Sequence, residues 1–181
     1  MGAAQFTPEE TIDETCKKIN DLVKYIETHT AESDQDYIAT VKRVIEQHEA
    51  HLVQQCKGTV DPQLEANRIE VLFECGRIPE AAAPPYKAAL KALQDRIAAA
   101  TGKPYEPDER GKQVYRIKEE LKWLDFEIMD LTMLIRRKSM GWMPPEMPVA
   151  LEEMKRRQAY LIEELAKRTS SDAGVAGVAG K

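Results

Sequence analysis

The chain has 181 residues, of which 43% are hydrophobic and 31% charged, and its formal net charge is −5. This size suits one domain, or one compact bundle with an appendage, and the composition is ordinary for a soluble helical protein. The negative charge disfavours general nucleic-acid binding. No stretch approaches the roughly 20 apolar residues of a membrane span, and three cysteines without a CxxC pair favour a reducing compartment.

The first predicted helix covers about residues 8–28. Thr7 is suited to capping it, Pro8 fits the first helical position, and Glu10 completes a capping box. The residues of its apolar face follow at helical spacing: Ile12, Cys16, Ile19, Val23 and Ile26. The polar stretch 28–36 is predicted to be a loop.

Two further helices follow in the first half of the chain. One begins at Tyr37 and ends at Gly58. Its inward-facing residues are predicted to be Tyr37, Val41, Val44, Ile45, His48, Leu52 and Val53. The next begins at Asp61, a capping residue followed by proline, and ends at Gly76, which suits a left-handed C-terminal cap.

The consecutive prolines Pro84 and Pro85 predict a break or a distorted turn over residues 81–85, because two consecutive prolines cannot sit inside a helix. A short fourth helix is then predicted from Tyr86 to near Gly102. Residues 103–107 contain two prolines and are expected to be an extended linker.

The strongest pattern spans residues 114–135. Apolar residues there are spaced alternately by three and four, which is the a/d seam of three heptads: Val114, Ile117, Leu121, Leu124, Ile128, Leu131 and Ile135. Trp123, Phe126 and Met129 broaden the stripe. After a break at 141–145, the spacing resumes at Met147, Leu151, Met154, Leu161 and Leu165, with Gln158 as its one polar position. These patterns predict a helical hairpin, 109–140 packed against 146–168.

The predicted fold is therefore all-α. An N-terminal bundle of three to four helices covers residues 1–107, and a long antiparallel helical hairpin with a heptad seam covers 108–169. The tail 170–181 lacks the apolar residues to fold alone and is predicted to be flexible.

The sequence offers few candidates for chemistry. His48 and His51 lie one helical turn apart, with Cys56 downstream, but a zinc site needs three or four ligands and no second cluster supplies the rest. One packed and one surface histidine is the favoured interpretation. No nucleophile motif or glycine-rich phosphate loop is present. We therefore predict no catalytic, cofactor-binding or metal site, and no cofactor.

Two basic clusters lie near the predicted hairpin turn: Arg136, Arg137 and Lys138, then Lys155, Arg156 and Arg157. Together with Trp142 and Met143 they are candidates for partner contact, as one basic patch suited to an acidic protein or anionic lipid headgroups. The alternative, at even weight, is that they cap the helix end and pair with Glu152, Glu153 and Asp130.

A series of short motifs recurs in order along residues 7–107. The positions are Thr7, Pro8 and Glu10; Lys18, Ile19 and Asp21; a turn with Gly76, Ile78 and Glu80; and a closing Tyr105, Glu106 and Pro107. This ordered set resembles the family of alpha-subcomplex accessory subunit five of NADH:ubiquinone oxidoreductase (respiratory complex I). The hairpin from residue 109 has no counterpart in that family's core and is interpreted as an extension.

The resemblance implies a non-catalytic accessory subunit of mitochondrial complex I. It would sit peripherally at the inner membrane, on the matrix side, against peripheral-arm core subunits near the quinone-binding end. It would hold no flavin, iron–sulfur cluster or quinone. Two alternatives stay open: a coiled-coil adaptor of another large assembly, which the heptads support equally, and a small helical metal-binding protein built around His48, His51 and Cys56.

Overall fold

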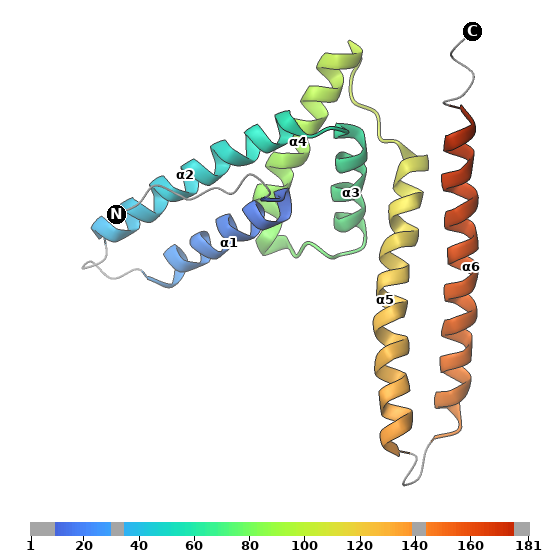
Figure 1. Ribbon diagram of the computed structural model, residues 1–181. Helices are drawn as coiled ribbons and strands as arrows, with labels where there is room; N and C mark the ends of the chain where they lie inside the picture. Colours follow the sequence, from blue (N-terminus) through green and yellow to red (C-terminus); the bar gives the residue numbers. More distant parts are fainter. Residues whose placement is uncertain (1–9, 30–34, 139–143, 176–181) are drawn as a thin grey trace. The chain divides into compact units, whose positions relative to one another are not determined.

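The structure, a computed structural model, describes residues 10–29, 35–138 and 144–175 (Figure 1). Regular structure in these ranges is helical throughout, which confirms the predicted all-α class. The elements are α1 (Ile12–Thr28), α2 (Gln35–Gly58), α3 (Pro62–Glu74), the short 3₁₀ helix η2 (Glu80–Ala82), α4 (Ala83–Thr101), α5 (Glu109–Lys138) and α6 (Glu146–Val175). The chain divides into two compact units, Met1–Asp108 and Glu109–Lys181, which are described separately.

The capping residue of α1 is Thr11, four residues after the predicted capping residue Thr7. The Thr11 hydroxyl accepts a hydrogen bond from the Glu14 backbone N–H at 3.3 Å, and the Glu14 carboxylate accepts one from the Thr11 N–H at 2.8 Å. The Thr-x-x-Glu pattern occurs twice in succession, and the second copy caps the helix. The role predicted for Glu10 is therefore wrong, while Thr7 and Pro8 lie outside the described residues.

The ends of α3 follow the sequence closely. The Asp61 carboxylate accepts a hydrogen bond from the Leu64 N–H at 2.9 Å, and Pro62 occupies the first turn, as predicted. At the other end Gly76 has φ +64°, a conformation that favours glycine. Its N–H donates to the Phe73 carbonyl at 3.0 Å, while the Arg77 N–H donates to the Leu72 carbonyl at 2.9 Å. This pair of bonds is a Schellman motif, which satisfies the last carbonyls of the helix.

Residues 81–82 lie in the short 3₁₀ helix η2, a distorted turn as predicted, but the helix start predicted at Tyr86 is wrong, because Pro84 and Pro85 lie in the first turn of α4. The N–H groups of a first turn have no intrahelical partner, so prolines there remove no hydrogen bond. The helix consequently starts at Ala83 rather than after the prolines. It ends at Thr101, where Gly102 adopts φ +67° as its left-handed cap.

Helix α4 is central to the first unit, since α1, α2 and α3 each pack against it (Figure 1). Leu93 and Ala89 on α4 are almost completely buried, and Leu52 from α2, Ile69 from α3 and Cys16 from α1 meet them in the same core cluster. The core therefore joins all four helices around one helix.

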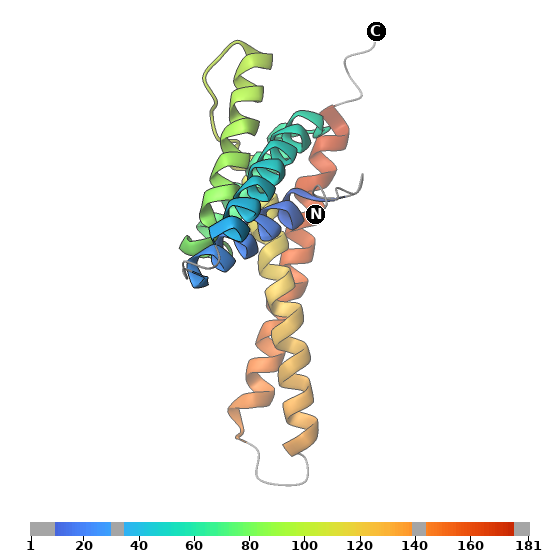
Figure 2. The same cartoon turned by 90° about the vertical axis from the view of Figure 1, so that its left-hand side faces the viewer.

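The second unit is the predicted hairpin, and its two helices lie side by side in both views (Figures 1 and 2). Ile117, Leu124 and Leu161 are buried in its seam, as the heptads predict. The prediction that Trp123, Phe126 and Met129 broaden that seam is wrong, because these residues are 44%, 59% and 53% exposed.

Helix α6 also runs further than predicted, through the first residues of the supposed flexible tail to Val175. Extending an existing helix fixes one residue for each hydrogen bond gained, so little apolar surface is needed there. Residues 176–181 lie outside the described part.

Replacing Leu93 by alanine tests the core around α4. The Leu93 side chain is fully buried, so we expect its truncation to lower the free energy of unfolding by about 2–5 kcal/mol. Urea denaturation followed by circular dichroism measures the change. Val60→Ala is the matched control, because Val60 is 98% exposed and should change stability by less than about 0.5 kcal/mol. Similar losses in both variants would contradict this assignment of the core.

Candidate functional site

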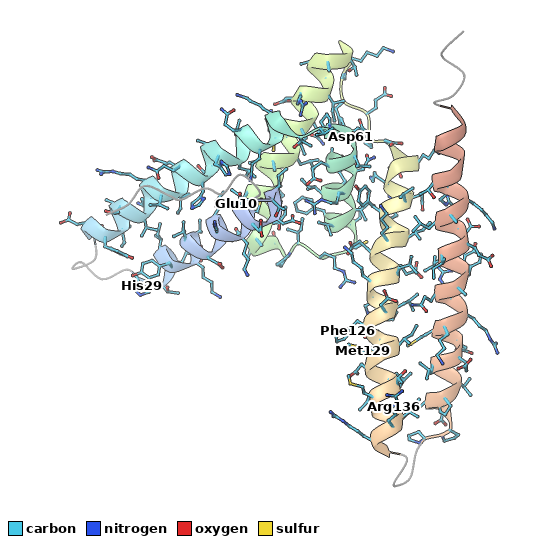
Figure 3. The ribbon with its side chains drawn as sticks, viewed as in Figure 1. Glu10, His29, Asp61, Phe126, Met129 and Arg136 are labelled. Atoms are coloured by element: carbon cyan, nitrogen blue, oxygen red, sulfur yellow. The ribbon has the colours of Figure 1, made fainter. Side chains whose placement is uncertain are left out.

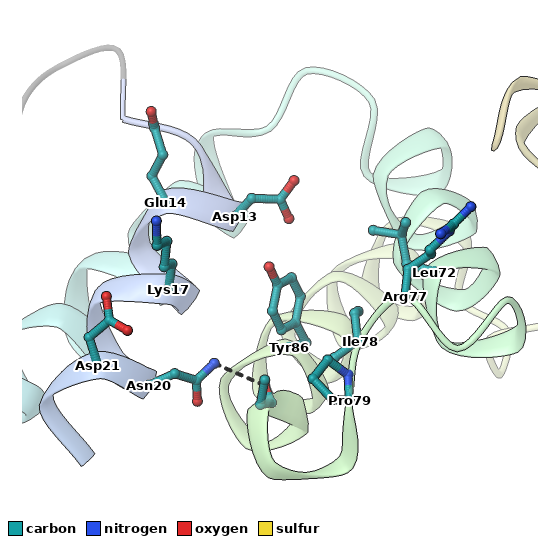
Figure 4. A pocket seen from close by; sticks show the side chains of 11 residues that line it. Asp13, Glu14, Lys17, Asn20, Asp21, Leu72, Arg77, Ile78, Pro79 and Tyr86 are labelled. Carbon is teal, nitrogen blue, oxygen red and sulfur yellow. Dashed lines mark hydrogen bonds between the residues drawn. The ribbon is translucent and has the colours of Figure 1, made fainter. Parts of the chain in front are cut away.

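A cavity of about 460 Å³ lies between α1, the turn after α3 and the start of α4 (Figure 4). We call it the α1 cavity. Its floor is apolar and includes Leu72, Ile78 and Ala82, whereas its rim is charged. The rim residues are Asp13, Glu14, Lys17, Asp21 and Arg77. An apolar floor with a polar rim is the usual form of a binding site for a side chain or small ligand.

The Gly76 turn shapes one wall of the α1 cavity. Because the chain reverses at Gly76, Ile78 enters the core with 8% exposure, while Arg77 and Pro79 line the cavity on either side of it. Asn20 fixes the opposite wall, since its side-chain amide donates to the Ala82 carbonyl at 3.0 Å. This bond joins α1 to the entry of α4 (Figure 4).

A charged network stands at one side of the cavity. Arg68 donates to both carboxylate oxygens of Asp13, at 2.8 and 3.1 Å, and to Glu65 at 3.0 Å. Burial alone would lower the pKa of the Arg68 guanidinium, but the hydrogen bonds to Glu65 and Asp13 outweigh it and raise the pKa. Two-pronged arginine–carboxylate bonds of this kind are among the stronger polar contacts in proteins. They hold α1 against α3.

Tyr86 points toward Asp13 across the α1 cavity (Figure 4). Burial, together with the negative charge of Asp13, raises the pKa of Tyr86 to about 12. The phenol therefore keeps its proton at neutral pH, and it serves as a hydrogen-bond donor rather than a base.

Two of the sequence motifs meet at this cavity. Asp21 comes from the motif on α1 and Ile78 from the turn after α3, and both line it. The neighbouring motif residue Ile19 lies in the core with 2% exposure. Glu80 is exposed at the start of η2. The α1 cavity is therefore where the first and middle motifs come together in space.

Glu10 and Lys18 of the first motif form a salt bridge of 3.1 Å, and the Thr15 hydroxyl donates to the same Glu10 oxygen at 3.1 Å. Burial would raise the pKa of Glu10, but these two hydrogen bonds lower it. The Glu10 backbone carbonyl accepts a bond from the Gln55 amide at 2.5 Å. Glu10 therefore ties the start of α1 to α2.

The closing motif lies along α3 and α4. The Tyr105 hydroxyl donates to Glu70 at 2.8 Å, and the Asn67 amide donates to Asp108 at 3.0 Å. Glu106 and Pro107 are exposed between these two attachments. The predicted extended linker is thus attached to α3 at its middle residue, Tyr105, and through Asp108, which follows it.

The side chains considered for a metal do not form a ligand set. Among the described residues, no group of three or more His, Cys, Asp or Glu is arranged to hold a metal ion. The Cys56 thiol lies 3.7 Å from the Ala89 carbonyl, and burial raises its pKa to about 11. Burial likewise raises the pKa of Cys16 to about 12. Both thiols stay protonated, which makes them poor nucleophiles.

The structure separates Arg157 of the second basic cluster from the first cluster. Arg157 donates to Glu120 at 2.7 Å, and Lys155 pairs with Glu152 at 2.9 Å, as the alternative interpretation expected for Glu152. Glu120 precedes Arg136 by 16 residues on α5, which is about 24 Å along the helix axis. Arg136 and Arg137 therefore do not share one patch with Arg157.

The remaining candidates near the hairpin turn can be placed only in part. Arg137 and Arg156 are exposed on α5 and α6. Lys138 ends α5, and nothing further is described of its side chain. Trp142 and Met143 lie outside the described residues.

Comparisons with known protein families, with curated proteins and with solved structures find no match for this chain. Across the described helices, none combines the length and apolar character that would let it cross a membrane.

Two features of the first unit have no counterpart in the sequence analysis. Arg68 carries the network described above, and Arg96 donates to the carbonyls of Cys56, at 2.9 Å, and Thr59. Arg96 thereby satisfies the C-terminal end of α2, where a positive charge is favourable. Arg68 pairs with Glu65 one helical turn away, but Asp13 and both partners of Arg96 lie more than 35 positions away in sequence, where local spacing could not reveal them.

A second cavity, of about 400 Å³, also escaped the sequence analysis. It lies between α1, α2 and α4 and is mostly apolar. Its walls include Val23 and Val53, which are 38% and 40% exposed. The sequence analysis had expected both valines to face inward.

The buried histidine predicts a pH dependence of stability. His48 is 5% exposed, and burial lowers its pKa below 6.5, although Glu10 opposes the shift. The unfolded chain therefore binds this proton more readily, so stability falls as the pH drops below about 6.5 and through the folded-state pKa. Chemical denaturation at a series of pH values should show this slope, and His48→Gln should flatten it.

A second loss of stability is expected below about pH 4.5. It arises from protonation of Glu10, because the pKa of this carboxylate is lower in the folded chain than in the unfolded chain. His48→Gln should leave that loss in place. Lys18 and His51 also face this cluster, so the comparison is made between single variants in the same buffer. A wild-type curve that stays flat from pH 7.5 to 5.5 would contradict the neutral, buried state of His48.

Proposed function

We propose that this chain is a non-catalytic accessory subunit of mitochondrial respiratory complex I that attaches to the matrix-side peripheral arm. Its role is structural: apolar cavities and charged rims of the first unit contact neighbouring subunits, and the hairpin adds a further surface. The proposal rests on the ordered motifs of residues 7–107. One observation on their arrangement supports it: Asp21 and Ile78, 57 residues apart in sequence, line a single cavity.

The composition of the α1 cavity favours docking over catalysis. Asp13 is held by Arg68, Glu14 serves the cap of α1, and Tyr86 keeps its proton. Exposed Lys17 and Asp21 remain on the rim, above the apolar floor. A rim of mixed charge over an apolar floor suits a side chain with an aliphatic stem and a polar end, such as arginine or lysine, supplied by a neighbouring subunit.

A coiled-coil adaptor of another large assembly is the second candidate. The observation that favours it is the hairpin, which has its own buried seam and also carries large exposed apolar residues on α5. Long helices with unburied apolar stripes are common devices for joining subunits.

Native electrophoresis of mitochondrial membranes from the source organism separates these two candidates. Complex I is located by its NADH dehydrogenase activity, and this chain by mass spectrometry of the same lane. Co-migration with the active band is the expected result. Recovery of the chain only in other assemblies would exclude the complex I proposal and leave the adaptor.

Asp21→Arg combined with Arg77→Glu tests the α1 cavity as the attachment site. Both residues lie on the rim and are exposed, so the fold should persist, while incorporation of the chain into the active band should fall by roughly tenfold or more, as for the loss of a central contact. Glu27→Arg is the matched control, because Glu27 is exposed on the same helix but does not line the cavity. Full incorporation of the double variant would exclude this cavity.

A further inference from the structure

Helix α5 carries a second heptad seam. The first seam packs against α6, and the second is displaced around the helix: Tyr115, Glu119, Lys122, Phe126, Met129, Met133 and Arg136. These positions again alternate by three and four. At about 100° of rotation per residue, Phe126 lies roughly 200° from the buried Leu124. The second seam therefore runs along the face of α5 opposite α6.

The centre of the second seam is exposed. Phe126, Met129 and Met133 are 59%, 53% and 41% exposed, and the adjacent Trp123 is 44% exposed. Figure 3 shows Phe126 and Met129 on the side of α5 that faces away from α6. Such a contiguous apolar stripe is typical of an interface with another molecule.

Two copies of the second seam can pair in the antiparallel direction with complementary residues at each end. We consider two copies of α5 that run antiparallel with Phe126 of one opposite Met129 of the other. Each step forward along one helix is then a step back along the other, which fixes the remaining pairs. Glu119 then lies opposite Arg136, and Lys122 lies opposite Met133. The apolar residues meet in the middle, and an acidic residue meets a basic one at each end. Glu119 also forms a salt bridge of 2.6 Å with Lys122 on its own helix, and the Lys122 stem covers Met133 of the other copy. An interface between two identical surfaces needs this kind of self-complementarity.

The rim of this register holds one unfavourable pair. Arg116 of one copy approaches Arg137 of the other at the ends of the contact. Glu109 pairs with Arg116 at 3.3 Å, which offsets the repulsion. The centre of the rim is compatible, because Trp123 lies near Asp130 and no like charges meet there.

We propose that α5 pairs with α5 of a second copy of this chain, antiparallel, in the register that sets Glu119 opposite Arg136. The two hairpins then form a four-helix arrangement with a twofold axis between Phe126 and Met129. The inference concerns the isolated chain and goes beyond the proposed attachment to complex I, so either can fail without the other.

The size of the stripe sets the strength of this dimer. Each copy contributes four large side chains, about half of whose surface is already covered. Full burial of an aromatic side chain covers roughly 150–250 Å², so the contact falls at the low end of specific interfaces. The dimer is therefore weak and depends on concentration, and it does not resemble an obligate oligomer.

Charge exchange tests both the partner and the register. The mass of the full-length chain is measured by sedimentation equilibrium over a wide range of concentration. Wild type should pass from monomer to dimer, and Glu119→Arg or Arg136→Glu alone should weaken the dimer by roughly tenfold. The double variant carrying both exchanges should regain dimer formation. Glu119 and Arg136 are 17 residues, or about 25 Å, apart on one helix, so a second copy is required for the rescue.

Phe126→Ser should remove the dimer, while Val149→Ser should not, because Val149 is equally exposed, at 59%, but lies on α6. Circular dichroism and the melting temperature verify that each variant folds. A wild-type chain that stays monomeric at every concentration, as expected if a helix of another protein occupies the seam, would overturn the proposal. A double variant that fails to recover would overturn it as well.

Discussion

The burial of α4 on several sides at once is the constraint on which the first unit depends. A helix that must contact α1, α2 and α3 together needs small residues where the others approach, and Ala83 and Ala89 provide them. Larger residues such as Leu93 then fill the space that remains. Each fully buried leucine contributes roughly 1.5–3 kcal/mol, so a few such positions are enough to fix the helix. The prolines at its start set where the chain enters this environment.

Polar contacts decide how the surrounding helices meet α4. Arg68 joins α3 to α1 through Asp13, Arg96 joins α4 to the end of α2, and Asn20 joins α1 to the entry of α4. Each contact is part-buried, and each satisfies a group that would otherwise lose its hydrogen bond to water. These bonds fix the orientation of the helices around the core, which apolar packing alone would specify less precisely. Two of them, from Asn20 and to Asp13, involve residues that line the α1 cavity.

The sequence was sufficient to predict that the helices form, but it did not predict all of their first and last residues. Apolar spacing and capping residues predicted α3 and the hairpin seam, since Asp61, Gly76 and the heptads act locally. The predicted start of α1 was wrong because two capping patterns follow one another in the sequence. Only the packing of Ile12 and Cys16 against the core selects the second pattern. The prolines of α4 were misinterpreted because their effect depends on whether they fall in the first turn.

The candidate site was harder to predict for a physical reason. Asp21 and Ile78 belong to motifs that follow one another along the chain, but whether the two residues meet depends on how α1 packs on α4. The roles of Arg68 and Arg96 depend on the same packing. Long-range pairs of this kind leave no periodic trace, so they emerge only when the fold is known.

Helix α5 exposes more apolar side chains than its pairing with α6 requires. A helix that had only to pair with α6 would need one apolar seam, and charged residues would cover the rest of its surface. Phe126, Met129 and Met133 instead occupy the opposite face at heptad spacing. Exposed large apolar residues reduce solubility, so their regular placement on one face is most simply explained by a helix that covers them. The two cavities of the first unit and this stripe on the second are therefore apolar surfaces that the described residues leave exposed in each unit.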